Sequence, residues 1–159
     1  MGLNEIFGIR NLTSKTHHLD VSELENDFTR ADLHFSGVDH ANYSYRLHVF
    51  FNNEKAQLSS ELSSVAGYAG TLMIFGHGGC YGGPGHCTVR ERNRPADFRR
   101  SHPLQKAFKR LNVTEPLRLA LKKNKTFILS IVPEIVGGTA RCCKPSEHLF
   151  EKVNLVTYD

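Results

Sequence analysis

The sequence lacks several features that would assign it to a common class of protein. It has no Trp and only two Met in 159 residues, and no apolar run approaches the roughly 18 to 20 residues of a membrane-spanning helix. The first ten residues show no basic stretch followed by an apolar core, so no signal peptide is visible in this chain. The net charge of +4 is too small to identify a partner by itself.

Familiar catalytic and nucleotide-binding motifs are also missing. The Gly-rich segment GHGGCYGGPGHC lacks the Lys-Ser/Thr of a phosphate-binding loop and the Gly-x-Gly-x-x-Gly that opens a helix, and the chain has no Gly-x-Ser-x-Gly nucleophile elbow. It has no pair of His four residues apart, the spacing that builds common catalytic metal sites on helices. The sequence therefore predicts no intrinsic enzymatic activity.

The composition is that of an ordinary globular domain. A single domain of 159 residues buries about 70% of the surface of its unfolded chain, so it needs no metal or disulfide merely to fold. Its four Cys permit two bridges but are too few for a disulfide-dense miniprotein. The acceptor pattern Asn-x-Ser/Thr favours an extracellular, secreted protein, and it occurs at Asn11, Asn42, Asn112 and Asn124. In that case the chain is a mature segment or an excised domain.

Alternating apolar and polar residues predict two half-buried strands in the first third of the chain, at 31–36 and 45–51. The short polar connection between them predicts an antiparallel hairpin. In such a hairpin His34 and His48 would lie opposite one another on the polar face. They would then be either two solvated imidazoles or a metal-binding pair.

The other predicted elements are short and separated by turns. Ser22 and Glu25 have the spacing of a capping box, which predicts a helix over about 23–29. Thr114 is a good N-cap for a second helix over 115–123. The remaining segments are predicted to be a loop at 52–67, strands at 70–75 and 111–114, a central strand at 126–132 and a final strand at 149–158.

These elements predict a mainly β protein. The helices are too few and too short to cover a parallel sheet, so we expect an antiparallel β-sandwich, jelly-roll-like, with one or two short helices. Residues 1–19 form an extended lead-in and residues 20–159 a single sandwich domain, which carries a Gly/Cys/His-rich loop and a basic excursion at 76–110.

The Gly-rich segment TLMIFGHGGCYGGPGHC at 71–87 carries the most distinctive chemistry. An apolar, β-prone run leads into a loop with four candidate ligands: His77, Cys80, His86 and Cys87. Imidazole nitrogens and thiolates suit zinc or copper. Because His86 and Cys87 are adjacent and would hardly reach the same ion, a four-ligand site would need help from elsewhere, for instance from Cys142 or His102.

Disulfide bonding is the alternative for the same sulfurs. In an oxidising compartment Cys80 and Cys87 could close a small ring, or each could pair with Cys142 or Cys143. Adjacent cysteines seldom bond each other, so Cys142 and Cys143 are expected to bond elsewhere. The metal and disulfide hypotheses both stay open at this point.

A long basic segment follows the Gly-rich loop, with eight Lys or Arg between residues 90 and 110. It is either a solvated loop or a patch for phosphate or an acidic surface. No aromatic stacking pattern accompanies these residues, which disfavours nucleic acid as the partner.

The order of these features resembles a known domain. The segments DVSELENDF, ADLHFSGVDH, YSYRLHVFFNN, GYAGTLMIFGHGG, LNVTEPLRLAL and TFILSIVPEIVGG resemble the C-terminal β-sandwich of type 3 copper proteins. That family comprises tyrosinases, catechol oxidases and molluscan-type hemocyanins. The resemblance covers most of the chain from about Leu19, and its most specific parts are Ala69-Gly70-Thr71 and the closing Ile-Val-Pro strand.

The resemblance implies a non-catalytic role. In the family, His residues of a separate helical domain bind the two coppers, and the sandwich shields the copper entrance. The implied partner is therefore a copper-binding helical domain, in cis or in trans, of a copper oxidase or an oxygen carrier. The segment 76–110 looks like an insertion relative to the family, so the resemblance implies no role for its residues. An independent copper- or zinc-delivery module is the alternative function, and a polyanion-binding module is a third.

Overall fold

The computed structural model describes residues 4–5, 16–20, 24, 27–40, 44–76, 106–122, 126–136 and 149–159. In chain order their elements are β1 (Asn4–Glu5), β2 (Thr16–Asp20), β3 (Arg30–Val38), β4 (Ser44–Phe51), β5 (Tyr68–Ile74), β6 (Ala107–Asn112), α1 (Thr114–Leu121), β7 (Thr126–Val136) and β8 (Lys152–Tyr158). Two of these strands, β1 and β2, come from the segment predicted to be an extended lead-in.

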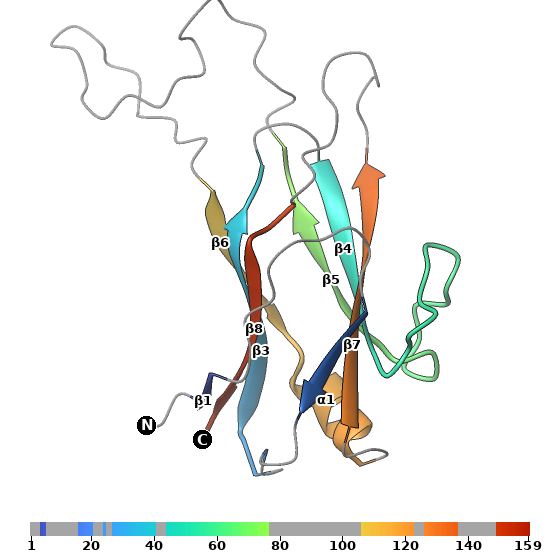
Figure 1. Cartoon of the computed structure of the whole chain (residues 1–159), viewed down its shortest axis with the longest axis vertical. Helices are drawn as coiled ribbons and strands as arrows, with labels where there is room; N and C mark the ends of the chain where they lie inside the picture. The colour runs from blue at the N-terminus through green and yellow to red at the C-terminus, as the bar shows by residue number, and fades with distance from the viewer. Residues whose placement is uncertain are drawn as a thin grey trace, which may run out of the picture.

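The strands form two four-stranded sheets that face each other (Figure 1). The first sheet has the order β1-β8-β3-β6 and the second the order β2-β7-β4-β5, with every neighbour antiparallel. The first strand pairs with the last, the second with the seventh, the third with the sixth and the fourth with the fifth. This is the topology of a doubled-over ribbon wound into a sandwich, the jelly roll. The predicted fold class is confirmed.

The core lies between the sheets because side chains alternate along each strand. Ala31, Leu33 and Phe35 of β3 are completely buried, and they face Leu47 and Val49 of β4 across the core. The end of the core beside α1 is closed by that helix, whose Leu117 and Ala120 belong to the same cluster. The strand boundaries predicted from the period-two pattern are therefore confirmed to within a few residues.

The predicted hairpin of β3 and β4 is wrong. β3 pairs with β6 and β8, whereas β4 pairs with β5 and β7, so the two strands belong to opposite sheets. The chain therefore passes from the first sheet to the second between β3 and β4. His34 and His48 therefore lie on opposite outer faces and cannot form the predicted pair.

Helix α1 begins at Thr114, and the predicted capping role of this residue is also wrong. The N-cap position is taken by the preceding residue, Val113, whose side chain makes no capping hydrogen bond. The backbone N–H of Thr114 instead donates to Asn112 Oδ1 at 3.2 Å, and the Thr114 hydroxyl oxygen accepts the backbone N–H of Ala31 at 2.9 Å. The buried hydroxyl thus ties the start of the helix to β3, a long-range role that the local spacing does not reveal.

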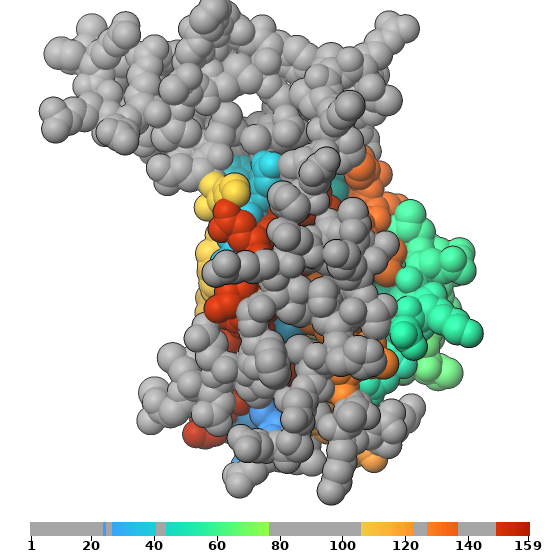
Figure 2. All heavy atoms as spheres, in the orientation of Figure 1, coloured from blue at the N-terminus to red at the C-terminus, as the bar shows by residue number. Residues whose placement is uncertain are grey.

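Two further local predictions can be compared with the structure. Phe28 is buried in the core, but Asp27 to Thr29 form a turn and a bend rather than the end of the predicted helix. Ser22 and Glu25, the predicted capping box, lie outside the described residues. The segment 52–67 consists of turns and bends, as predicted, and forms a ridge on one side of the molecule (Figure 2).

Candidate functional site

The sandwich has a loop end, which we define as the end where β3, β5 and β7 finish and β4, β6 and β8 begin (Figure 1). Antiparallel pairing places these strand ends together: Ser44 opposite Val136, Tyr45 opposite Ile74, and Val38 opposite Ala107. The segments 77–105 and 137–148 are therefore both joined to this end. The topology brings the attachment points of the two cysteine-bearing segments to the same end of the molecule.

The predicted ligands themselves are not described. His77, Cys80, His86, Cys87, His102, Cys142 and Cys143 all lie outside the described residues, so both the metal site and the disulfides stay predictions. Within the described ranges, no three His, Cys, Asp or Glu side chains form a group able to hold a metal ion. Of the predicted basic patch, the described residues Lys106, Lys109 and Arg110 are exposed at the start of β6 and along it.

A tyrosine anchors the loop end. The Tyr45 hydroxyl lies 2.7 Å from the carbonyl oxygen of Asp39 and 2.9 Å from that of Leu149, both acceptors. It therefore links the connection after β3 to the segment before β8. Burial, reinforced by the charge of Asp39, raises the pKa of Tyr45 well above its usual range, so the phenol stays a neutral donor.

Large apolar side chains remain exposed at and near the loop end. Phe75, the residue after β5, is 77% exposed, and Met73, Phe108 and Ile135 are each about half exposed. Met73 and Phe75 lie on edge strand β5 and just beyond it, Phe108 is near the start of edge strand β6, and Ile135 is near the end of β7. We call these four residues the apolar rim. Three of them come from the second sheet and Phe108 comes from the first, and exposed apolar groups at one end of a molecule favour an interaction surface there.

A polar chain of five side chains crosses the outer face of the second sheet. His48 Nε2 lies 3.0 Å from Glu134 Oε2, and His48 Nδ1 lies 2.8 Å from Thr71 Oγ1. Arg46 donates to the same Glu134 oxygen at 3.0 Å, and the Tyr68 hydroxyl lies 2.6 Å from Thr71 Oγ1. Three adjacent strands, β4, β5 and β7, contribute the five residues.

The direction of these hydrogen bonds follows from the carboxylate. An ionised carboxylate can only accept, so His48 Nε2 carries a proton, and in neutral His48 Nδ1 accepts from Thr71. Thr71 then accepts from Tyr68. Each of the five side chains is hydrogen-bonded, and His48 is only 9% exposed. The hydrogen-bonded row therefore aligns three strands and presents no free nucleophile. We regard it as a structural network.

Glu134 gives this network a pH dependence. The hydrogen bond from His48, followed by that from Arg46, lowers the pKa of Glu134 below 4.5. Its ionised form is therefore favoured by folding, and that stabilisation is lost as the pH falls from 4.5 through the folded-state pKa. We expect Glu134→Gln to be slightly less stable at neutral pH but to lose less stability on acidification than the unmodified chain. Urea unfolding at neutral pH and at a series of pH values below 4.5 measures the difference.

Glu115→Gln is the matched control for that measurement, because Glu115 pairs with Arg118 on the exposed surface of α1. If Glu134→Gln and Glu115→Gln follow the same acid profile, the His48–Glu134 contact does not stabilise the fold.

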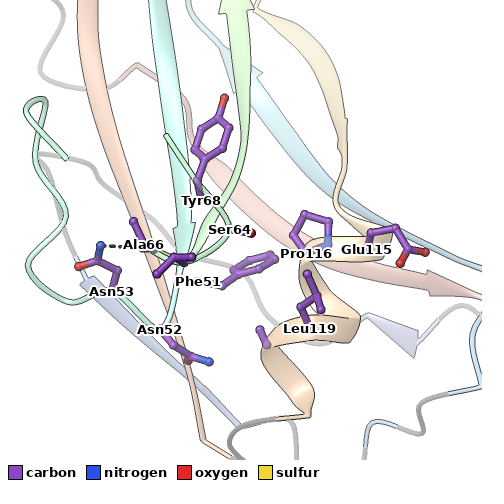
Figure 3. A pocket seen from close by; sticks show the side chains of 12 residues that line it. Phe51, Asn52, Asn53, Ser64, Ala66, Tyr68, Glu115, Pro116 and Leu119 are labelled. Atoms are coloured by element: carbon purple, nitrogen blue, oxygen red, sulfur yellow. Dashed lines mark hydrogen bonds between the residues drawn. The ribbon is translucent and has the colours of Figure 1, made fainter. Parts of the chain in front are cut away.

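A concave region lies at the opposite end of the sandwich from the loop end. A half-open cavity of about 550 Å³ separates the 52–67 loop from α1. The Phe51 ring points toward Pro116 of the helix, while the Tyr68 hydroxyl points away from the cavity, and Asn53 Nδ2 donates to the carbonyl oxygen of Ala66 at 2.8 Å (Figure 3). Glu115 is the one ionisable residue in the lining apart from Tyr68. The cavity thus offers apolar surface but no catalytic group.

On the outer face of the first sheet, His34 contacts aromatic side chains. Its Nε2 lies 3.1 Å from the Tyr158 hydroxyl, and its ring meets Phe108 edge-on at 5.1 Å between centroids. Both contacts join His34 to aromatic side chains of neighbouring strands, which supports a packing role for His34. Within the described ranges, no helix has the length and apolar character needed to cross a membrane.

No protein-family model matches the chain, and no curated protein matches it.

Proposed function

We propose that this chain is a non-catalytic β-sandwich domain that covers the copper entrance of a type 3 copper protein, tyrosinase- or hemocyanin-like. The apolar rim at the loop end is the observation that carries the proposal, because Phe75 is left 77% exposed beside the segment that departs from the family pattern. Covering such a side chain with a partner surface stabilises the complex by about 25 cal/mol per Å² of apolar area buried.

The arrangement of the sandwich suits this role. The segments that resemble the family form β3, β4, β5, α1 and β7, which are three of the four strands of the second sheet, one strand of the first sheet and the closing helix. A cover must hold its contact residues in fixed positions, and β5 and β7 hold Met73 and Ile135 in strands that pair with β4. The described part of the chain contributes rigidity and apolar contact, while the partner's histidines would hold the copper.

Two assays test this function. The chain alone, loaded with copper, is expected to oxidise no diphenol. When the same chain is joined to the copper-binding helical domain encoded in its own gene, we expect slower turnover of diphenols or slower access of phenols to the copper. Cutting the chain between the two domains should restore the turnover. Phe75→Ala in the joined protein should also raise turnover. Robust diphenol oxidation by the chain alone would overturn the proposal.

The Cys/His-rich segment motivates a second proposal, an independent copper- or zinc-delivery module. It places two thiols and two imidazoles, from His77, Cys80, His86 and Cys87, in one short stretch. In this case the purified protein is expected to bind a stoichiometric copper or zinc ion, and Cys80→Ser should abolish that binding because it removes a thiolate ligand. Metal analysis of both proteins measures the effect.

Mass spectrometry with and without reductant counts the disulfide bridges and so tests the alternative to metal binding. Two intact bridges in a metal-free protein would end the delivery hypothesis and support a covalent clasp between the two segments attached at the loop end. Cys143→Ser is the matched control, because it removes a thiol that is not among the proposed ligands and is expected to leave the metal content largely unchanged.

A further inference from the structure

One of the acceptor sequences in the chain, Asn112-Val113-Thr114, lies where the structure describes it fully. Asn112 is exposed and is the last residue of β6, which is the edge strand of the first sheet. In the antiparallel register it lies opposite Asp32 of β3. The carboxamide therefore stands at a corner of the molecule where the edge strand gives way to α1.

The hydrogen bonding of Asn112 leaves the reactive nitrogen available. Its Oδ1 accepts the backbone N–H of Thr114 at 3.2 Å, whereas Nδ2 donates to none of the described residues. Substitution of one Nδ2 hydrogen by a sugar would keep Oδ1 as the acceptor. The folded structure can thus carry a glycan at Asn112 without losing a hydrogen bond.

The Thr114 hydroxyl fixes when the modification can take place. In the folded chain Thr114 is buried, and its oxygen accepts the backbone N–H of Ala31 at 2.9 Å. Enzymes that modify Asn-x-Thr need an accessible, flexible acceptor sequence. The transfer must therefore occur before α1 docks on β3, as it would on a chain entering the secretory pathway.

We infer that Asn112 is an N-glycosylation site whose glycan covers the end of edge strand β6. In the transfer, Nδ2 of Asn112 bonds to the anomeric carbon of a lipid-linked oligosaccharide. The bond between that carbon and the pyrophosphate oxygen breaks, and a base takes up the proton that Nδ2 loses. A bulky polar group here would hinder pairing of β6 with another chain, which an exposed edge otherwise invites.

The position of the site also agrees with the proposed shielding role, although the inference does not rest on it. β6 runs from the loop end, where Phe108 belongs to the apolar rim, to Asn112 at the end that α1 closes. At roughly 3.3 Å per residue the strand places about 17 Å between its two ends. A glycan on Asn112 would leave the loop end free for a partner.

The test is expression of the full chain behind a secretory leader in eukaryotic cells. Enzymatic removal of N-glycans in heavy-oxygen water converts a modified Asn into labelled Asp, which peptide mass spectrometry locates. The peptide with Asn112 is expected to be labelled in most molecules. An unlabelled Asn112 would overturn the inference, whether the other acceptor sites, Asn11, Asn42 and Asn124, are labelled or not.

Two variants separate modification from folding. Asn112→Asp keeps an oxygen that accepts the Thr114 N–H but destroys the acceptor sequence, so the secreted protein should lose the gel shift of one glycan and keep its melting temperature. Thr114→Ser keeps both the acceptor sequence and a hydroxyl, so the label at Asn112 should persist. An unchanged gel shift in Asn112→Asp would contradict the assignment.

Discussion

Replacing Phe35 by Ala is expected to lower the free energy of unfolding by about 3–5 kcal/mol, because it empties a large volume between the two sheets. Phe35 is fully buried in β3, and its ring meets that of Phe150 edge-on with 5.1 Å between centroids. For a chain of 159 residues a loss of this size corresponds to a fall in melting temperature of roughly 10 °C. Urea unfolding should show a lower midpoint at an unchanged slope.

Phe75→Ala is the matched control for Phe35→Ala, since it deletes the same atoms from a ring that is 77% exposed. Its free energy of unfolding should stay within about 0.5 kcal/mol of that of the unmodified chain. The pair also separates stability from function, because Phe75→Ala should affect only the contact with the partner. Equal unfolding midpoints for the two variants would mean that Phe35 does not lie between the sheets.

The faces of the strands were predictable from sequence, while their partners were not. A period of two is a local property, so the alternation in 31–36 correctly assigned Ala31, Leu33 and Phe35 to the core. Pairing depends on the whole chain. A short polar connection suits both a hairpin and a crossing between sheets. Here β3 pairs instead with β6 and β8, which begin about 70 residues or more after β3 ends.

The same limit explains what the sequence analysis missed at the candidate site. The alternation placed His48 on the outer side of its strand, yet its partner Glu134 comes from β7, 86 residues further along the chain. The alternation also places Asp32 on the polar side of its strand, yet Asp32 is completely buried, and Arg30 pairs with it at 2.8 Å. An outer sheet face can be covered by other parts of the chain, and alternation alone carries no information about that cover.

Gly67→Ala is expected to destabilise the fold by roughly 2–3 kcal/mol, through left-handed strain of about 1–2 kcal/mol and a disturbed hydrogen bond of about 1 kcal/mol. Gly67 has a φ of +80°, and a Cβ there would overlap the backbone carbonyl oxygen of Phe51. The carbonyl oxygen of Gly67 also accepts the N–H of Phe51 at 2.7 Å, so relief of the overlap would disturb this bond. Thermal and urea unfolding measure the loss.

Gly37→Ala provides the comparison that isolates the backbone clash. Gly37 has a similar φ of +68°, but a Cβ there would meet the side chain of Glu151, which is flexible and can move aside. Gly37→Ala should therefore cost only the conformational strain of about 1–2 kcal/mol. The difference in unfolding free energy between the two variants measures how tightly the start of β5 is held against the end of β4. Because Met73 and Phe75 lie on β5 and just beyond it, this also measures how firmly they are held at the loop end. If the two variants lose equal stability, Phe51 and Gly67 are not held in this close contact, and the apolar rim would lack the fixed position that a shielding domain requires.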